Sequence, residues 1–164
     1  MRHLLMQFRG RNHGPLVQFI KYGIAGAAAT AVHTVAFFLA AWLVLPALGA
    51  NDPLARLLGV QPPTVVEALR ARNAALDNLI AFFFSNTTAY VLNVLWVFEG
   101  GRHHRLVEIG MFFGVSAISM VVGTFLQSIL IYKYGMATTF AFVANIVAAM
   151  LINYAMRKFV IFKG

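Results

Sequence analysis

Four long apolar segments constrain this chain more than any other feature of its sequence. They cover residues 22–48, 79–98, 109–131 and 137–156. A helix needs about 20 apolar residues to cross the hydrocarbon core of a bilayer. The segments are continuously apolar and lack the alternation of β-barrel strands. The sequence therefore predicts an all-α membrane protein, a single domain over residues 1–164 with four transmembrane helices.

Charged residues are scarce and mostly basic. Only 11% of the 164 residues are charged, against about a quarter in soluble domains. The net charge of +8 comes from short tracts between the apolar segments, which suit anionic headgroups and topology control better than nucleic acid. The absence of cysteine excludes disulfides and thiolate chemistry. The only apolar patch in residues 1–15 is 4–6, too short for a signal peptide, so we expect the first segment to remain as an anchor.

The positions of the basic residues predict the orientation of the chain. They precede the first segment and follow the second and the fourth, whereas the long connection 49–78 balances three acids against three arginines. By the positive-inside rule both termini are cytoplasmic (N-in/C-in) and 49–78 is an extracytoplasmic loop. The cytoplasmic set is Arg2, Arg9, Arg11, Lys21, Arg102, Arg105, Arg157, Lys158 and Lys163.

The loop carries helix signals of its own. Asp52 followed by Pro53 is typical of an N-cap and a first helical residue, and predicts a short helix. Thr64 and Glu67 have the spacing of a capping box, and the helix that they open could run on into the second segment. The loop is either an interfacial cap on the membrane surface or an element that gates substrate or docks a partner.

The chain also contains an internal repeat. Residues 89–98 align with 153–162, so that Ala89 matches Asn153 and Tyr90 matches Tyr154. The first and third segments begin alike, with Phe19-x-x-Tyr22 against Ile109-x-x-Phe112. The alignment predicts two tandem helical hairpins in the same orientation, a parallel repeat.

These features resemble the GtrA-like family of small four-helix membrane proteins. The resemblance rests on residues 19–26, Phe-Ile-Lys-Tyr-Gly-Ile-Ala-Gly, leading to Thr30, and on hairpin ends similar to the family's Asn-[Phe/Tyr]-x-x-x-[Arg/Lys]-x-Trp-x-Phe. It implies a multi-pass protein of the inner (cytoplasmic) membrane that serves cell-surface polysaccharide synthesis. Such proteins are thought to flip a polyprenyl-phosphate-linked sugar or to assist the glycosyltransferase that makes it. Val160 replaces the second tryptophan, Ala89 stands opposite Asn153, and His33 lies where an acid is expected.

Polar residues follow one face of each predicted span at steps of three and four. For a single Ser, Thr or Gly, helix packing is the simpler interpretation, and Gly26-x-x-x-Thr30 and Gly110-x-x-x-Gly114 suit it. An amide also suits a polar headgroup, and His33 is either a neutral hydrogen-bonded residue or a proton-sensitive, substrate-contacting one. The candidate substrate-binding residues within the spans are Thr30, His33, Asn86, Tyr90, Asn93, Gln127, Asn145 and Asn153.

Cations at the cytoplasmic ends of the spans complete the predicted site. Lys and Arg there can reach headgroup depth and pair with a lipid phosphate. We select Lys21, Arg157 and Lys158 for this role, with Arg102 and Arg105 as alternates. Topology signalling alone explains each of them equally well.

No enzyme constellation is visible. All five acids lie outside the apolar segments or at their edges, and the sequence has no phosphate-binding glycine loop. We therefore expect no catalysis, no cofactor and no metal. Three functions remain: a flippase for a polyprenyl-phosphate sugar, a non-transporting anchor for a membrane glycosyltransferase, and, ranked last for want of a membrane carboxylate, a small proton-coupled exporter. Four helices enclose little volume, so we expect a homodimer.

Overall fold

The computed structural model describes residues 15–97 and 105–156, and the regular elements in these ranges are all helices. This confirms the predicted all-α class. The elements are α2 (Pro15–Leu43), α3 (Pro53–Leu58), α4 (Glu67–Leu92) with its π-helical continuation η1 (Asn93–Val97), α5 (Arg105–Tyr134) and α6 (Thr138–Met156).

Three of the described helices are long and apolar enough to cross a membrane: Leu16–Leu43, Glu67–Val97 and Phe112–Tyr134. Helix α6 has a shorter apolar stretch, Thr138–Ala149, which falls below that length. A protein with several membrane helices is therefore established, and the fourth span stays a prediction.

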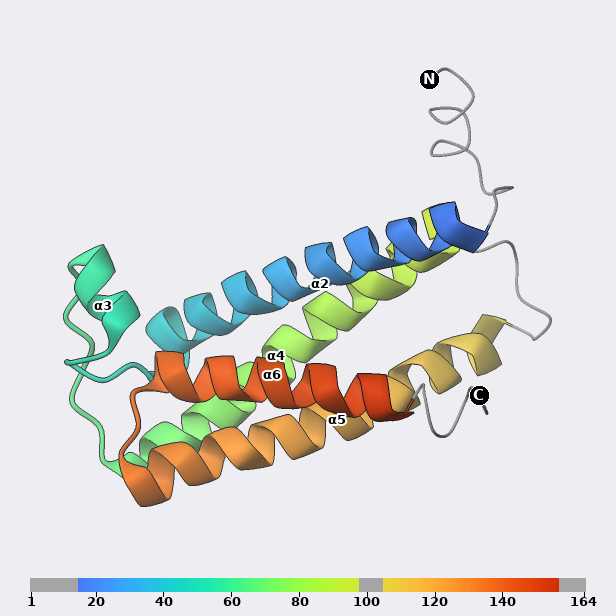
Figure 1. Ribbon diagram of the computed structural model, residues 1–164. Helices are drawn as coiled ribbons and strands as arrows, with labels where there is room; N and C mark the ends of the chain where they lie inside the picture. Colours follow the sequence, from blue (N-terminus) through green and yellow to red (C-terminus); the bar gives the residue numbers. More distant parts are fainter. Residues whose placement is uncertain (1–14, 98–104, 157–164) are drawn as a thin grey trace.

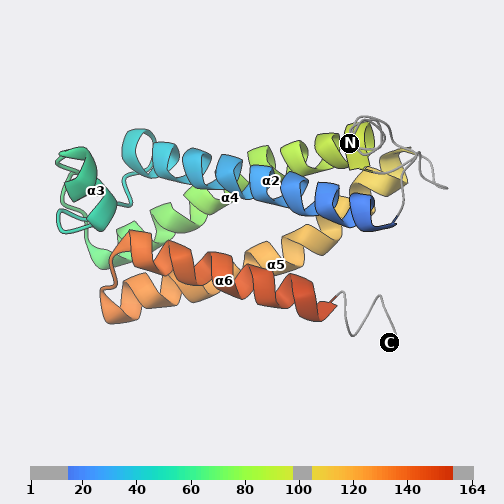
Figure 2. The same ribbon diagram turned by 45° about the horizontal axis from the view of Figure 1, so that its top comes forward.

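The long helices form an elongated bundle (Figure 1). Helices α2 and α4 make one antiparallel hairpin, α5 and α6 make the other, and α4 also packs against α5. We call the end that holds α3 and the α5–α6 turn the loop end. We call the opposite end, where α2 and α5 begin and α6 ends, the basic end. In the view of Figure 1, α2 and α6 lie closer together at the loop end than at the basic end, and Figure 2 shows the same bundle turned by 45°.

The helix boundaries differ from the hydropathy segments in an informative way. Helix α2 begins at Pro15 and ends at Leu43, and α4 begins at Glu67, which lies 12 residues before the predicted second segment. The loop between the first two long helices is therefore shorter than 49–78. The expectation that a loop helix runs on into the second span is confirmed.

The two predicted caps in the loop fare differently. Asp52 caps α3 by accepting a hydrogen bond from the Leu54 amide at 3.1 Å, and Gly59 ends the helix in the left-handed conformation with φ 65°. The capping box is wrong: Val66 precedes α4 without a side-chain cap, and Glu67 instead pairs with Arg70.

The outside of the bundle is apolar, and its interior contains polar as well as apolar side chains. Large apolar side chains are exposed on every long helix, among them Val35, Phe84, Val121 and Val147. Amides and hydroxyls are buried between the helices, among them Asn78, Asn86, Ser119, Gln127 and Asn145. This distribution suits a bilayer, because lipid offers no hydrogen bonds to polar groups.

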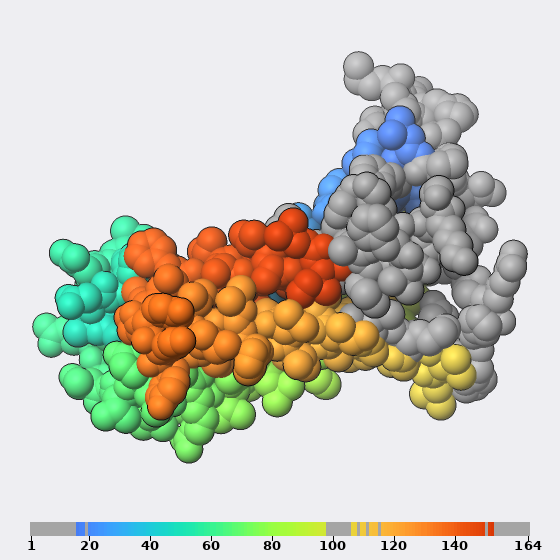
Figure 3. All heavy atoms as spheres, turned by 60° about the horizontal axis from the view of Figure 1, so that its bottom comes forward, coloured from blue at the N-terminus to red at the C-terminus, as the bar shows by residue number. Residues whose placement is uncertain are grey.

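Helices α5 and α6 lie side by side along their length (Figure 3), and Gly123 sets their approach. A Cβ atom there would lie 2.0 Å from Asn145 Oδ1 and 3.2 Å from the Asn145 backbone oxygen. On the same helix, a Cβ at Gly114 would meet nothing within 4 Å.

We therefore expect Gly123→Ala to lower the free energy of unfolding by about 1–3 kcal/mol, because it overpacks a buried contact. Thermal unfolding of the purified protein in detergent measures this. Gly114→Ala is the matched control and should be neutral. Equal stability of the two variants would contradict the close approach of α5 and α6.

Candidate functional site

One residue from each long helix meets in a buried hydrogen-bond network at the centre of the bundle. Asn78 on α4 donates to Gln127 Oε1 on α5 at 2.6 Å. Asn145 Nδ2 on α6 donates to both, at 3.1 Å to Asn78 Oδ1 and 2.8 Å to Gln127 Oε1. His33 on α2 completes the set, with Nε2 3.4 Å from Asn78 Oδ1. We call His33, Asn78, Gln127 and Asn145 the amide network.

Both ring nitrogens of His33 lie next to polar groups. Nε2 is 3.4 Å from Asn78 Oδ1, an oxygen that only accepts hydrogen bonds, so Nε2 carries a proton in that contact. Nδ1 is 3.1 Å from Ser85 Oγ, and the Ser85 hydroxyl group can donate either to Nδ1 or to the Phe82 carbonyl at 3.2 Å. A neutral imidazole corresponds to the first arrangement and an imidazolium to the second, so both interpretations given to His33 fit these contacts.

Apolar packing closes the bundle between the amide network and the loop end. The Phe142 ring stacks on His33 at 5.8 Å and on Phe37 at 4.2 Å between ring centroids, which ties α6 to α2. Ala74, Ala81 and Ile131 belong to the same buried cluster. This apolar cluster fills much of the interior between the network and the loop end, beside the buried polar residues Asn73 and Asp77 of α4.

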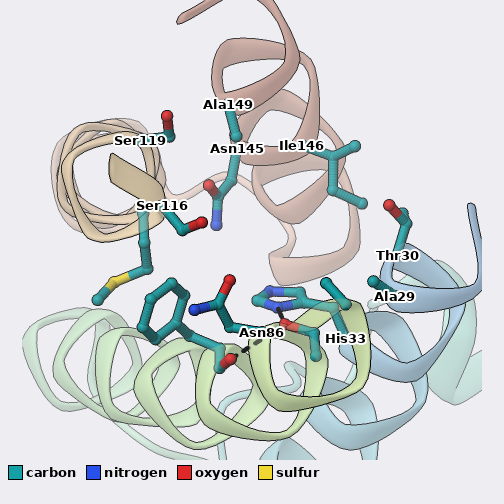
Figure 4. Close-up of a pocket in the computed structure, with 13 residues that line it drawn as sticks. Ala29, Thr30, His33, Asn86, Ser116, Ser119, Asn145, Ile146 and Ala149 are labelled. Atoms are coloured by element: carbon teal, nitrogen blue, oxygen red, sulfur yellow. Dashed lines mark hydrogen bonds between the residues drawn. The ribbon is translucent and has the colours of Figure 1, made fainter. Parts of the chain in front are cut away.

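On the other side of the network, toward the basic end, the four helices line a cavity of about 210 Å³ (Figure 4). His33 and Asn145 form its inner limit, and Ser116 contributes a hydroxyl group from α5. The Asn86 side chain extends into the cavity, and the residue is only 6% exposed. Its Nδ2 has no hydrogen-bond partner. A buried donor without a partner marks a place where a polar ligand group would be stabilised.

Lys21 lies at the basic end of the bundle, on the same side of the network as the cavity. Its side chain is fully buried, Nζ lies 3.4 Å from the Trp96 carbonyl oxygen, and it stands 5.4 Å from the centroid of the Trp96 ring. Trp96 belongs to the π-helix η1, where one extra residue per turn changes the carbonyl directions. The sequence predicted a Lys21 side chain that reaches headgroup depth. In the structure this side chain is instead buried next to Trp96.

The remaining predicted site residues divide into three groups. Thr30, His33, Asn86 and Asn145 line the cavity, and Gln127 lies in the network next to it. Tyr90 packs edge-on against Phe112 outside the cavity, and Asn93 donates to the Ala89 carbonyl of its own helix. The side chain of Asn153 and the whole of Arg102, Arg157 and Lys158 fall outside the described residues, as does the Arg105 side chain.

The predicted polar face of α2 is partly wrong. Gly23 and Gly26 are exposed, and a Cβ at either would meet nothing within 4 Å. The buried face of α2 instead carries Ala25, Ala29 and Phe37. Gly26-x-x-x-Thr30 and Gly110-x-x-x-Gly114 are therefore not packing motifs between the described helices of one chain.

Sequence reasoning missed Asn78, Ser85 and Asp77. Asn78 and Ser85 fall seven residues apart on the face that Asn86 and Asn93 continue, but the segment was taken to start at residue 79. The same boundary hid Asp77, which is fully buried in α4. Asp77 is the acid at the edge of the second apolar segment, and the structure buries it within the bundle at the loop end.

The loop end is held together by side chains from three parts of the chain. Asp52 accepts hydrogen bonds from the Thr139 amide at 2.9 Å and from its hydroxyl group, so one carboxylate serves both α3 and the start of α6. Arg70 pairs with Glu67 and donates to Thr138 Oγ1 at 3.3 Å. These contacts tie the loop to the bundle, and both alternatives, an interfacial cap and an element that gates substrate or docks a partner, stay predictions.

Taken together, the fold and cavity define a small helical membrane protein with a polar chamber between two hairpins. The family model for the GtrA/DPMS transmembrane domain matches residues 21–162, and the chain belongs to that family. This confirms the resemblance found in the sequence and associates the chain with lipid-linked sugar processes. Comparison with curated proteins and with solved structures found no significant match.

The amide network should make a measurable contribution to stability. Asn78→Leu leaves His33, Gln127 and Asn145 each short of a partner. A hydrogen bond between membrane helices contributes on average about 0.6 kcal/mol and at most about 1.7 kcal/mol, so we expect a loss of about 2 kcal/mol in thermal unfolding. Thr88→Val is the control, because its hydroxyl group bonds only to Phe84 of its own helix. Unchanged stability of Asn78→Leu would mean that the network is not formed.

Proposed function

We propose that this protein translocates a polyprenyl-phosphate-linked sugar across the cytoplasmic membrane. The observation that carries the proposal is the cavity between the hairpins, with the partnerless Asn86 amide inside it and apolar residues around its outside. A sugar hydroxyl group can accept a hydrogen bond from Asn86 Nδ2, while the polyprenyl chain stays in lipid. Membership of the GtrA/DPMS family supports this substrate class.

The proposed topology places the cavity on the cytoplasmic side. Both termini are cytoplasmic by the distribution of basic residues, so the basic end faces the cytoplasm. Helix α6 is the fourth span, because its 19 residues reach about 28 Å, close to the thickness of the hydrocarbon core. The cavity then opens inward, and the apolar cluster and amide network separate it from the loop end.

The phosphate is held by cations at the basic end, of which Lys21 is the one described. In the present arrangement Lys21 contacts the Trp96 carbonyl group and ring. Phosphate binding brings an anionic oxygen within reach of this ammonium group, which adds the attraction between two opposite charges to the hydrogen bond.

The cavity is smaller than most ligand sites, which enclose about 300–1,000 Å³. The hairpins must therefore separate further, or a second copy must widen the chamber. The exposed glycines Gly23, Gly26, Gly110 and Gly114 permit close approach of another helix, and we propose that they serve a homodimer. The same faces favour the alternative function, docking of a membrane glycosyltransferase.

Filling the cavity tests the translocation proposal directly. We expect Ala149→Phe to abolish movement of a fluorescent polyprenyl-phosphate sugar between the leaflets of liposomes that contain the purified protein, because Ala149 lines the cavity. Ala148→Phe is the matched control, since Ala148 faces an apolar groove on the outside of α5 and α6 and should leave the rate unchanged.

Two outcomes contradict the proposal. Equal rates for the two variants would place the path elsewhere. No movement by the wild type, combined with stable co-purification of a glycosyltransferase, would favour the accessory function instead.

Lys21 provides a second prediction. Lys21→Met keeps the length of the side chain and removes its charge, so we expect at least a tenfold loss in apparent affinity for the lipid phosphate. That loss corresponds to about 1.4 kcal/mol, the low end for a hydrogen bond to a charged group. Lys133→Met, at the exposed loop end, is the control. Titration of the transport rate against the density of labelled lipid gives both affinities, and equal values would exclude Lys21 from phosphate binding.

A further inference from the structure

Two buried side chains on α4, Asp77 and Asn73, carry oxygen atoms that the proposed function does not use. Asp77 is 0% exposed and Asn73 is 4% exposed. Neither carboxyl oxygen of Asp77 has a hydrogen-bond partner, and Asn73 Oδ1 also lacks one. The two residues lie four apart on α4, so their side chains are neighbours on one face of the helix.

The described surroundings offer Asp77 no compensating charge. Arg70, two turns earlier on α4, is engaged by Glu67 and Thr138. On α5, Lys133 is exposed and lies over the Tyr134 ring. On α2, His33 bonds to Asn78 and Ser85, and α6 contains no charged residue. Asp52, in the connection between α2 and α3, bonds to Thr139.

An ionised carboxylate is very unstable in such a place, because it loses its hydration and gains no hydrogen bond. A neutral carboxylic acid is much more stable there, because its O–H group can donate a hydrogen bond to an acceptor one helical turn away. Asn73 Oδ1 is such an acceptor, and this single bond would satisfy both Asn73 and one oxygen of Asp77.

We propose that Asp77 and Asn73 form a proton-binding site at the loop end, with Asp77 holding a proton in the structure described here. The proton is taken from water and bound to one carboxyl oxygen, which donates it in a hydrogen bond to Asn73 Oδ1. The site lies outside the cavity, and the proposal does not depend on lipid transport.

A proton fits this site better than a metal ion. Hard cations require six or more oxygen ligands, and the partnerless side-chain oxygens found here are three, on two residues. The buried residues of the neighbouring cluster, such as Ala74, Ala81 and Ile131, are apolar.

Release of the proton has a structural consequence. Asn73 Nδ2 donates to the Pro46 carbonyl at 2.8 Å and so ties α4 to the connection after α2. An ionised Asp77 needs a donor, and this amide group lies one helical turn away on the same face of α4. Ionisation therefore competes with Pro46 for Asn73 and loosens the connection between α2 and α3.

The chain allows a direct test, because Asp52 and Asp77 are its only two aspartates. Cell-free synthesis with carboxyl-¹³C aspartate gives a full-length protein with two labelled carboxyl groups, which infrared or NMR spectra in nanodiscs can resolve. We expect a protonated carboxyl signal at neutral pH. Asp52→Asn leaves Asp77 as the single labelled side chain, and the protonated signal should remain in that variant.

The wild-type protein alone can overturn the proposal, so the test survives if Asp77→Asn fails to fold. Two ionised signals at neutral pH would contradict it. A signal that is protonated in choline chloride but ionised in sodium chloride would also contradict it, by identifying a sodium site instead.

The consequence for the loop is measured by hydrogen exchange of residues 47–52. After correction for intrinsic exchange, we expect the wild type to lose protection there as the Asp77 signal titrates, whereas Asp77→Asn, which mimics the neutral acid, keeps its protection. Parallel behaviour of the two proteins would show that Asp77 does not control this contact.

Discussion

The amide network is the contact on which the rest of the bundle depends. Each long helix contributes one residue to it, and lipid offers no alternative partner to an unpaired amide, so the four helices must meet at this level. The network also divides the interior. Toward the loop end the helices close over apolar side chains, and toward the basic end the cavity opens between the hairpins. The cavity, the amide network and the apolar cluster thus follow one another along the length of the bundle.

Much of the architecture could be predicted from sequence because hydropathy and capping act locally. The helix class, the Asp52 cap and the inward face of α5 through Gln127 follow from such signals. The start of α4 could not be predicted in this way, because hydropathy measures transfer to lipid and not burial against protein. The hydropathy of Asp77 and Asn78 is typical of loop residues, yet both side chains are buried within the bundle. The prediction of the buried face of α2 failed for a related reason. Small residues occur both in helix contacts and on open surfaces, and Gly23 lies on an open surface.

The internal repeat explains why the network is asymmetric. The alignment that matches Phe19 with Ile109 also matches Phe37 with Gln127, and the alignment of the hairpin ends matches Asn78 with Phe142. In the structure Gln127 bonds to Asn78 across α5 and α4, and Phe37 stacks on Phe142 across α2 and α6. The positions that the predicted repeat pairs therefore carry different chemistry in the two contacts: an amide hydrogen bond between α4 and α5, and an aromatic stack between α2 and α6. The polar pair belongs to the network, and the aromatic pair belongs to the apolar cluster.

The same correspondence accounts for the position of the opening. One seam is filled near the cavity by Phe82 of α4 against Phe113 of α5, with ring centroids 6.1 Å apart. The repeat places Ile146 and Gly23 at the matching positions of the other seam. Ile146 lines the cavity, whereas Gly23 carries no side chain and lies on an exposed face of α2. Helices α4 and α5 pack closely, while α2 and α6 meet through Phe37 and Phe142 toward the loop end. The cavity therefore lies where α2 and α6 no longer touch through this aromatic pair, and the side of the bundle that is less tightly packed is the α2–α6 side.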